Sequence, residues 1–194
     1  IDLYASLFLI IDLGLPTLIA RDGTRAPELV PLAVWRSYRW QALVAVPFLL
    51  LALMARPEQW LNIHAPALLL VLAGLVALVH VASYAPRSAL RVLGEARLEA
   101  ITKVVERGVT VLLYGVLTWQ GASSATAFTG AFLVGATIGW ALALFWAMRV
   151  APPLEGAVEW GRLGNVWSTN RQLLAAALPF AITLGVLPYV IRIE

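Results

Sequence analysis

The sequence contains no cysteine and few charged residues. Without cysteine, disulfides, thiolate metal sites and a cysteine nucleophile are all excluded. Charged residues make up 13% of the chain and hydrophobic residues 61%, whereas an ordinary soluble domain is about 25% charged. The mean hydropathy of +0.83 is typical of a chain surrounded by hydrocarbon rather than by water.

Motifs for catalysis and cofactor binding are also lacking. There is no Walker loop, dinucleotide fingerprint, Gly-x-Ser-x-Gly elbow or His-Glu-x-x-His. The two histidines, His64 and His80, are too far apart to form a local metal site. The basic residues lie between apolar blocks rather than on an aromatic-rich face, which argues against nucleic acid as a partner. The sequence therefore predicts neither an enzyme nor a cofactor-dependent protein.

Long apolar stretches dominate the sequence. Each approaches the roughly 20 residues that a helix needs to cross a 30 Å hydrocarbon core. The sequence predicts an all-α, polytopic transmembrane helix bundle of about six spans, forming a single domain over residues 1–194. The predicted spans are 3–20, 40–55, 65–85, 104–119, 125–148 and 173–191.

Arginine and lysine are distributed unevenly between the connections. The five connections hold four, one, four, none and three of them, in chain order. This alternation follows the positive-inside rule and predicts a multi-pass protein of the cytoplasmic (inner) membrane, with the odd connections cytoplasmic and Ile1 on the outer side. Aromatic residues typical of membrane interfaces fall near the expected edges of the spans, at Trp35, Tyr38, Trp40, Trp60 and Trp119.

The ends of the sequence predict a fragment of a longer transporter. The chain starts at Ile1 and stops at Glu194 directly after an apolar run. The first stretch carries Asp2 and Asp12 and lacks a basic leader region and a small-residue cleavage site, so it is not a signal peptide.

Asp12 lies in the middle of the first predicted span, where an ionised carboxylate costs about 3 kcal/mol on insertion scales. Gly14 and Pro16 follow it and predict a kinked helix with free carbonyl groups. Two interpretations remain open: a group that binds a proton, a cation or substrate in a cavity, or a buried acid hydrogen-bonded to a neighbouring helix.

Arg192 and Glu194 close the last predicted span, after Pro179, Gly185 and Pro188 have weakened its helix. If the helix continues, Arg192 is an intramembrane cation that faces a cavity and can hold a phosphate. If the helix ends here, Arg192 extends to the outer surface.

Glu106 and Arg107 stand at the inner start of the fourth span. Arg107 is the last member of a stripe of charged residues spaced four apart, and Glu106 adjoins it. The stripe predicts a helical face exposed to water or, alternatively, a polar entrance to a cavity. His80, alone in the third span, is either a hydrogen-bonded interior histidine or a protonation site. The charged stripe consists of Arg91, Glu95, Glu99, Lys103 and Arg107.

Small residues recur every fourth position in the fifth span and include a Gly-x-x-x-Gly. Such rows let helix backbones approach closely in lipid. The row predicts packing against a helix of the same bundle, with dimerisation as the alternative. It consists of Ala131, Gly135, Gly139, Ala143 and Ala147.

Three stretches carry a resemblance to a known family. Residues 4–21, with Asp-Leu-Gly-Leu before Arg21, resemble the second helix of polysaccharide flippases in the multidrug/oligosaccharidyl-lipid/polysaccharide exporter superfamily. Residues 87–101 are similar to their inner loop between helices four and five. Residues 177–194, with Ala-Leu-Pro-Phe-Ala and then Arg-Ile-Glu, are similar to their seventh helix, although Glu194 replaces an aspartate.

The resemblance implies helices two to seven of a MATE-like N-terminal lobe. The implied function is to turn a lipid-linked oligosaccharide across the membrane by alternating access, with membrane lipids around the protein. Arg192 and Arg107 would then supply positive charge to the cavity, and Asp12 would accept a coupling proton or sodium ion.

Two other functions compete with this one. A cation-coupled multidrug antiporter of the same superfamily would use Asp12 as its exchange carboxylate. A membrane-embedded glycosyl transferase or polymerase would need a long outer loop with carboxylates and arginines, and the second and fourth connections are short.

Overall fold

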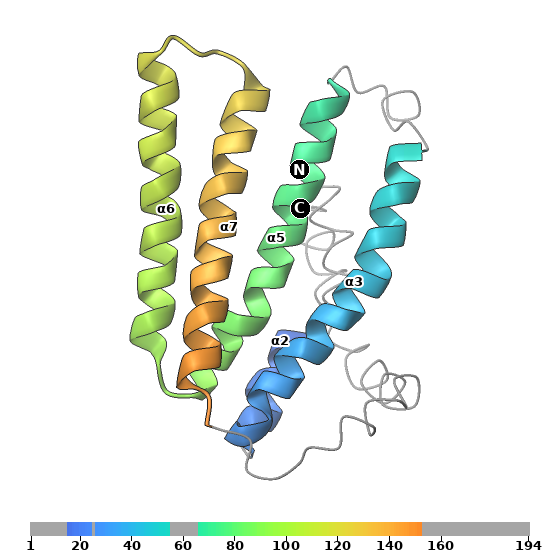
Figure 1. Cartoon of the computed structure of the whole chain (residues 1–194), viewed down its shortest axis with the longest axis vertical. Helices are drawn as coiled ribbons and strands as arrows, with labels where there is room; N and C mark the ends of the chain where they lie inside the picture. Colours follow the sequence, from blue (N-terminus) through green and yellow to red (C-terminus); the bar gives the residue numbers. More distant parts are fainter. Residues whose placement is uncertain (1–14, 25, 55–65, 153–194) are drawn as a thin grey trace, which may run out of the picture.

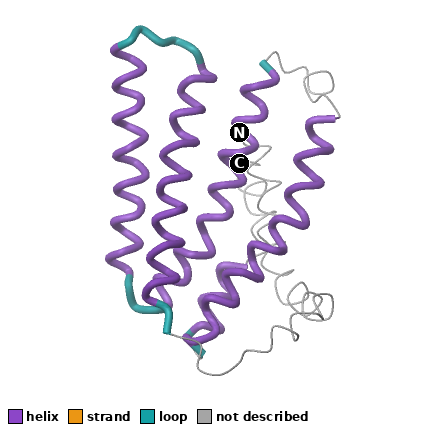
Figure 2. Tube along the Cα trace, in the orientation of Figure 1, coloured by secondary structure: helices purple, strands orange, loops and turns teal. Residues whose placement is uncertain are grey.

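The computed structural model describes residues 15–24, 26–54 and 66–152, and every regular element in these ranges is helical (Figure 2). The prediction of an all-α fold is therefore confirmed. The elements are α2 (Leu15–Gly23), a short 3-10 helix η1 (Pro27–Leu29), α3 (Val30–Met54), α5 (Ala67–Val92), α6 (Ala96–Trp119) and α7 (Ala125–Val150).

The four long helices contain 24 to 26 residues each, which corresponds to about 36–39 Å. α3 begins ten residues before the predicted start at 40, and α6 begins eight before 104. The predicted spans were short because apolar content marks only the part of a helix that favours hydrocarbon, whereas the hydrogen-bonded backbone continues through polar flanks. The sixth predicted span and most of the first lie outside the described residues.

Glycines stop two of the helices. Gly94 has φ 80° and Gly121 has φ 73°, the left-handed conformation that glycine adopts at helix ends. In both turns the next N–H reaches back five residues, from Glu95 to the Leu90 carbonyl at 2.8 Å and from Ala122 to the Leu117 carbonyl at 2.9 Å. These turns make α5, α6 and α7 consecutive antiparallel helices.

The spatial order of the helices differs from their order in the chain. α7 lies between α5 and α6, and α2 and α3 pack on the other side of α5 (Figure 1). A Cβ atom on Gly23 would meet Val92 at 2.7 Å and Val30 at 2.8 Å, so the α2–α3 turn lies beside the end of α5. The apolar core at this end is built largely from Ile19, Val30, Val34, Ala85, Ala89, Leu90, Ala143 and Ala147.

The polarity of α6 is reversed relative to a helix of a soluble protein. Its buried residues are all polar: Glu99, Thr102, Glu106 and Thr110. Its exposed face carries large apolar side chains, which include Ile101, Val104, Val111, Leu112, Val116 and Trp119. The polar face packs against α7, whose buried residues include all five members of the predicted small-residue row. The prediction that this row packs within the bundle is confirmed.

Basic residues gather in the half of the helices that holds the α5–α6 turn. The remaining stretches of the four long helices, residues 40–54, 67–86, 108–119 and 125–148, contain no Arg, Lys, Asp or Glu. Two helices in the described part of the chain, Ala67–Val92 and Ala125–Val150, are long and apolar enough to cross a membrane.

Candidate functional site

Three of the six predicted site residues, Glu106, Arg107 and His80, lie in the described part of the chain, and the structure brings them together. The other three, Asp12, Arg192 and Glu194, lie outside it. The site therefore centres on the carboxylate of Glu106, which stands midway along α6 and is only 2% exposed.

Glu106 forms an ion pair with Arg87 of α5, whose Nη2 donates a hydrogen bond to Oε2. Arg87 is itself 5% exposed. Two further basic groups face the second carboxylate oxygen: His80 Nε2 at 4.0 Å from Oε1 and Arg107 Nε at 3.9 Å. The carboxylate thus holds groups from α5 and α6 in one cluster, which we call the Glu106 cluster (His80, Arg87, Glu106 and Arg107).

Glycines of α7 make room for this cluster. A Cβ atom on Gly139 would meet the Glu106 Cβ at 2.7 Å and its Oε2 at 2.9 Å. One turn away, Thr110 donates a hydrogen bond to the Glu106 carbonyl at 2.8 Å and its hydroxyl fills the space over Gly135. Because α7 presents no side chain at these positions, the carboxylate can pass beside it and reach α5.

The cluster carries a net positive charge. With His80 neutral, two arginines and one carboxylate sum to +1, and a protonated His80 makes the sum +2. Arg87 Nε and His80 Nδ1 are buried without a hydrogen-bond partner, so both have unused hydrogen-bonding capacity. The His80 ring packs on Phe132 with centroids 5.6 Å apart. The net positive charge of the arrangement can attract an anion.

The predicted charged stripe does not form one solvated helical face, and that prediction is wrong. Arg91 belongs to α5, because the Gly94 turn separates it from α6. Glu99 is buried, at 7% exposure. The turn folds the chain back, so that Arg91 donates from Nε and Nη2 to the two Glu99 oxygens at 2.7 Å each, and Lys103 Nζ approaches Oε1 at 3.4 Å.

The hydrogen bonds from Arg91 lower the pKa of Glu99 below its ordinary value, despite the opposing effect of burial. Glu99 lies in the first turn of α6, before the apolar part of that helix. This carboxylate therefore stays ionised and ties the end of α5 to the start of α6.

Sequence reasoning missed Arg87, which was assigned to a cytoplasmic connection. The sequence did contain a pattern that places Arg87 near the site: it follows His80 by seven residues and therefore shares its helical face. Likewise Glu99, Thr102, Glu106 and Thr110 follow one another at intervals of three or four, which marks one polar face on α6. Among the described residues no three His, Asp or Glu side chains lie together as metal ligands.

No protein-family model, curated protein or solved structure matches this chain.

Proposed function

We propose that this chain is part of a multi-pass transporter of the cytoplasmic membrane, which turns lipid-linked oligosaccharide from the inner to the outer leaflet. The observation that carries the membrane placement is the reversed polarity of α6, with Glu99 and Glu106 inside and Val104, Val111 and Leu112 outside. Water would favour the opposite arrangement, whereas lipid favours apolar side chains on the outside and buried, paired charges.

The charge distribution supports one orientation. The basic ends of α3, α5, α6 and α7 would face the cytoplasm, and the long uncharged stretches of α5 and α7 would cross the hydrocarbon. Aromatic groups accompany the basic half: Trp35 and Tyr38 on α3 pack edge to face at 6.0 Å, and Tyr38 accepts a hydrogen bond from Trp140 of α7 at 3.0 Å. Such amphipathic rings are enriched where hydrocarbon meets the headgroups.

The transport function is supported by the Glu106 cluster and by the resemblance of three stretches to polysaccharide flippases. A pyrophosphate-linked sugar cannot cross hydrocarbon, so its carrier needs a polar interior with positive charge. The Glu106 cluster lies midway along α6 and combines the buried Arg87–Glu106 ion pair with the exposed cation of Arg107, so it supplies positive charge there. In this proposal the protein carries its substrate without changing it chemically.

The membrane placement can be tested by labelling, because the sequence has no native cysteine. Ala96→Cys lies at the start of α6 and Ser123→Cys in the α6–α7 turn, both exposed. In whole cells we expect a membrane-impermeant maleimide to label Ser123→Cys only, and to label Ala96→Cys at least tenfold more after permeabilisation. Equal labelling of both positions in intact cells would disprove the orientation.

The transport function can be tested by deleting the intact gene. We expect oligosaccharide repeat units to accumulate on their lipid carrier in the inner leaflet, because their polar heads no longer cross. Treatment of intact cells and of opened vesicles with a glycosidase measures this, and the wild-type gene should restore export. Normal surface polysaccharide together with lost drug efflux would instead identify a multidrug antiporter.

A further inference from the structure

Two basic side chains of α6 are exposed, and each lies near a buried carboxylate. Lys103 and Arg107 are one turn apart, and their side chains are 55% and 64% exposed. Lys103 Nζ is 3.4 Å from Glu99 Oε1, and Arg107 Nε is 3.9 Å from Glu106 Oε1. The Arg107 guanidinium also lies over the Phe132 ring of α7, 5.7 Å from its centroid.

These two cations are not neutralised by their carboxylates. Glu99 already binds Arg91 through two hydrogen bonds, and Glu106 already binds Arg87. Four cations therefore share two carboxylates, which leaves two positive charges (4 − 2 = 2). Arg87 is buried, and Arg91, although exposed, donates hydrogen bonds to both oxygens of Glu99. The surplus is therefore available to a ligand at Lys103 and Arg107.

An apolar surface continues along α6 from this pair. Val104, Val111 and Leu112 are 71%, 67% and 71% exposed. Between and beyond them, Gly108 and Gly115 have no side chain, and a Cβ atom at either would meet nothing within 4 Å. The two glycines are about 10 Å apart along the helix. We call this surface the α6 strip (Lys103, Val104, Arg107, Gly108, Val111, Leu112 and Gly115).

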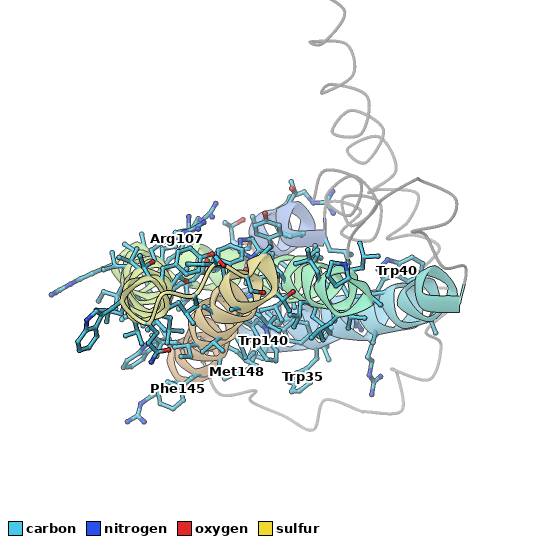
Figure 3. All side chains as sticks on the ribbon, turned by 90° about the horizontal axis from the view of Figure 1, so that it is seen from above. Trp35, Trp40, Arg107, Trp140, Phe145 and Met148 are labelled. Atoms are coloured by element: carbon cyan, nitrogen blue, oxygen red, sulfur yellow. The ribbon has the colours of Figure 1, made fainter. Side chains whose placement is uncertain are left out.

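The α6 strip is separate from the aromatic surface of the bundle. Viewed along the helices, Arg107 lies on the opposite side of the helix layer from Trp35, Trp140 and Phe145 (Figure 3). These three rings therefore do not cover Arg107, and within the part of the chain that the structure describes the charged and the apolar residues of the strip are both exposed.

From this charge complementarity we infer that the α6 strip binds an anionic phospholipid of the inner leaflet. The lipid phosphate lies between Lys103 and Arg107, and an acyl chain lies along Gly108, Val111 and Gly115. The inference rests on the proposed membrane orientation, which places the cations at the inner boundary of the hydrocarbon, where basic side chains recognise anionic headgroups. A zwitterionic lipid brings its own cation and does not match the surplus charge.

The test is lipid binding to the intact purified protein by native mass spectrometry, with phosphatidylglycerol and phosphatidylcholine of identical chains as probes. We expect Lys103→Gln/Arg107→Gln to weaken phosphatidylglycerol binding about 30-fold, or about 5-fold per charge. Phosphatidylcholine binding should not change. The matched control is Arg39→Gln/Arg149→Gln, which removes two exposed cations of α3 and α7 and should change phosphatidylglycerol binding less than 3-fold.

A second variant tests the acyl-chain contact. Gly108→Leu/Gly115→Leu keeps both cations and fills the open positions, so we expect weaker phosphatidylglycerol binding with unchanged binding of glycerol phosphate. Glycerol phosphate that binds as tightly as phosphatidylglycerol would show a simple phosphate site and overturn the inference. Equal phosphatidylglycerol binding by the Lys103/Arg107 variant and the wild type would also overturn it. Repeat-unit export is measured in Gly108→Leu/Gly115→Leu, which leaves every residue of the Glu106 cluster in place. Weakened lipid binding with normal export, or the reverse, therefore tells the failure of one proposal from the failure of the other.

Discussion

Replacing Glu106 with alanine is expected to destabilise the protein by about 3–5 kcal/mol, because the substitution leaves the buried cation of Arg87 without its counter-charge. The lost carboxylate also removes the nearest anionic neighbour of His80. We expect a fall in the midpoint of thermal unfolding of roughly 10 °C for the detergent-solubilised protein.

Two further variants separate charge pairing from packing. Arg87→Leu/Glu106→Leu removes both charges and should recover most of the lost stability, because a buried ion pair can be replaced by apolar groups at little cost. Glu28→Ala removes an exposed carboxylate from η1 and should change stability by less than about 0.5 kcal/mol. The pairing argument fails if Glu106→Ala is as mild as Glu28→Ala, or if the double variant is less stable than the single one.

Gly139→Leu is expected to separate α6 from α7 and to destabilise the bundle by about 1–3 kcal/mol or more. The new Cβ alone would lie 2.7 Å from the Glu106 Cβ and 3.1 Å from its Cγ. Those atoms cannot move aside without loosening the bond to Arg87, so we also expect lost activity in the export assay described above.

Gly130 provides the matched control on the same helix, because a Cβ there meets nothing within 4 Å. Gly130→Leu should leave unfolding and export close to wild type, since a leucine in a helix is favourable where space is open. If both substitutions have the same effect, glycine at 139 is not required for close packing, and the account of how Glu106 reaches α5 is wrong.

The helices themselves could be predicted from the sequence, because preference for hydrocarbon is a local property of each stretch. α7 was expected over residues 125–148 and extends over Ala125–Val150. The row containing Gly135 and Gly139 was also correctly predicted to pack against another helix of the bundle. Close approach of two helices needs only small or missing side chains on one face, which is again a local property of the sequence. Six membrane spans stay a prediction.

The partners within the site could not be predicted in the same way. Periodicity shows which residues share a helical face, but not which helix that face meets. Arg87 was therefore assigned to a loop, although it pairs with Glu106 nineteen residues later. The stripe prediction failed because the turn at Gly94 places Arg91 on α5 and folds it onto Glu99, which is buried, whereas Lys103 and Arg107 are exposed as expected. In a bundle with apolar surroundings, the polar side of a helix such as α6 packs inward, and Glu99 is buried on Arg91.

The position of α7 between its two predecessors bears on how the protein is synthesised. When the ribosome has completed α6, the glycines that accommodate Glu106 have not yet been translated, because Gly135 and Gly139 follow later in the chain. The nascent α5–α6 pair can form the Arg87–Glu106 ion pair but lacks the α7 backbone that packs against Glu106. Under the proposed membrane placement, insertion of this region is complete only when α7 has joined α5 and α6, and a chain truncated before residue 125 would lack the helix that packs over Glu106.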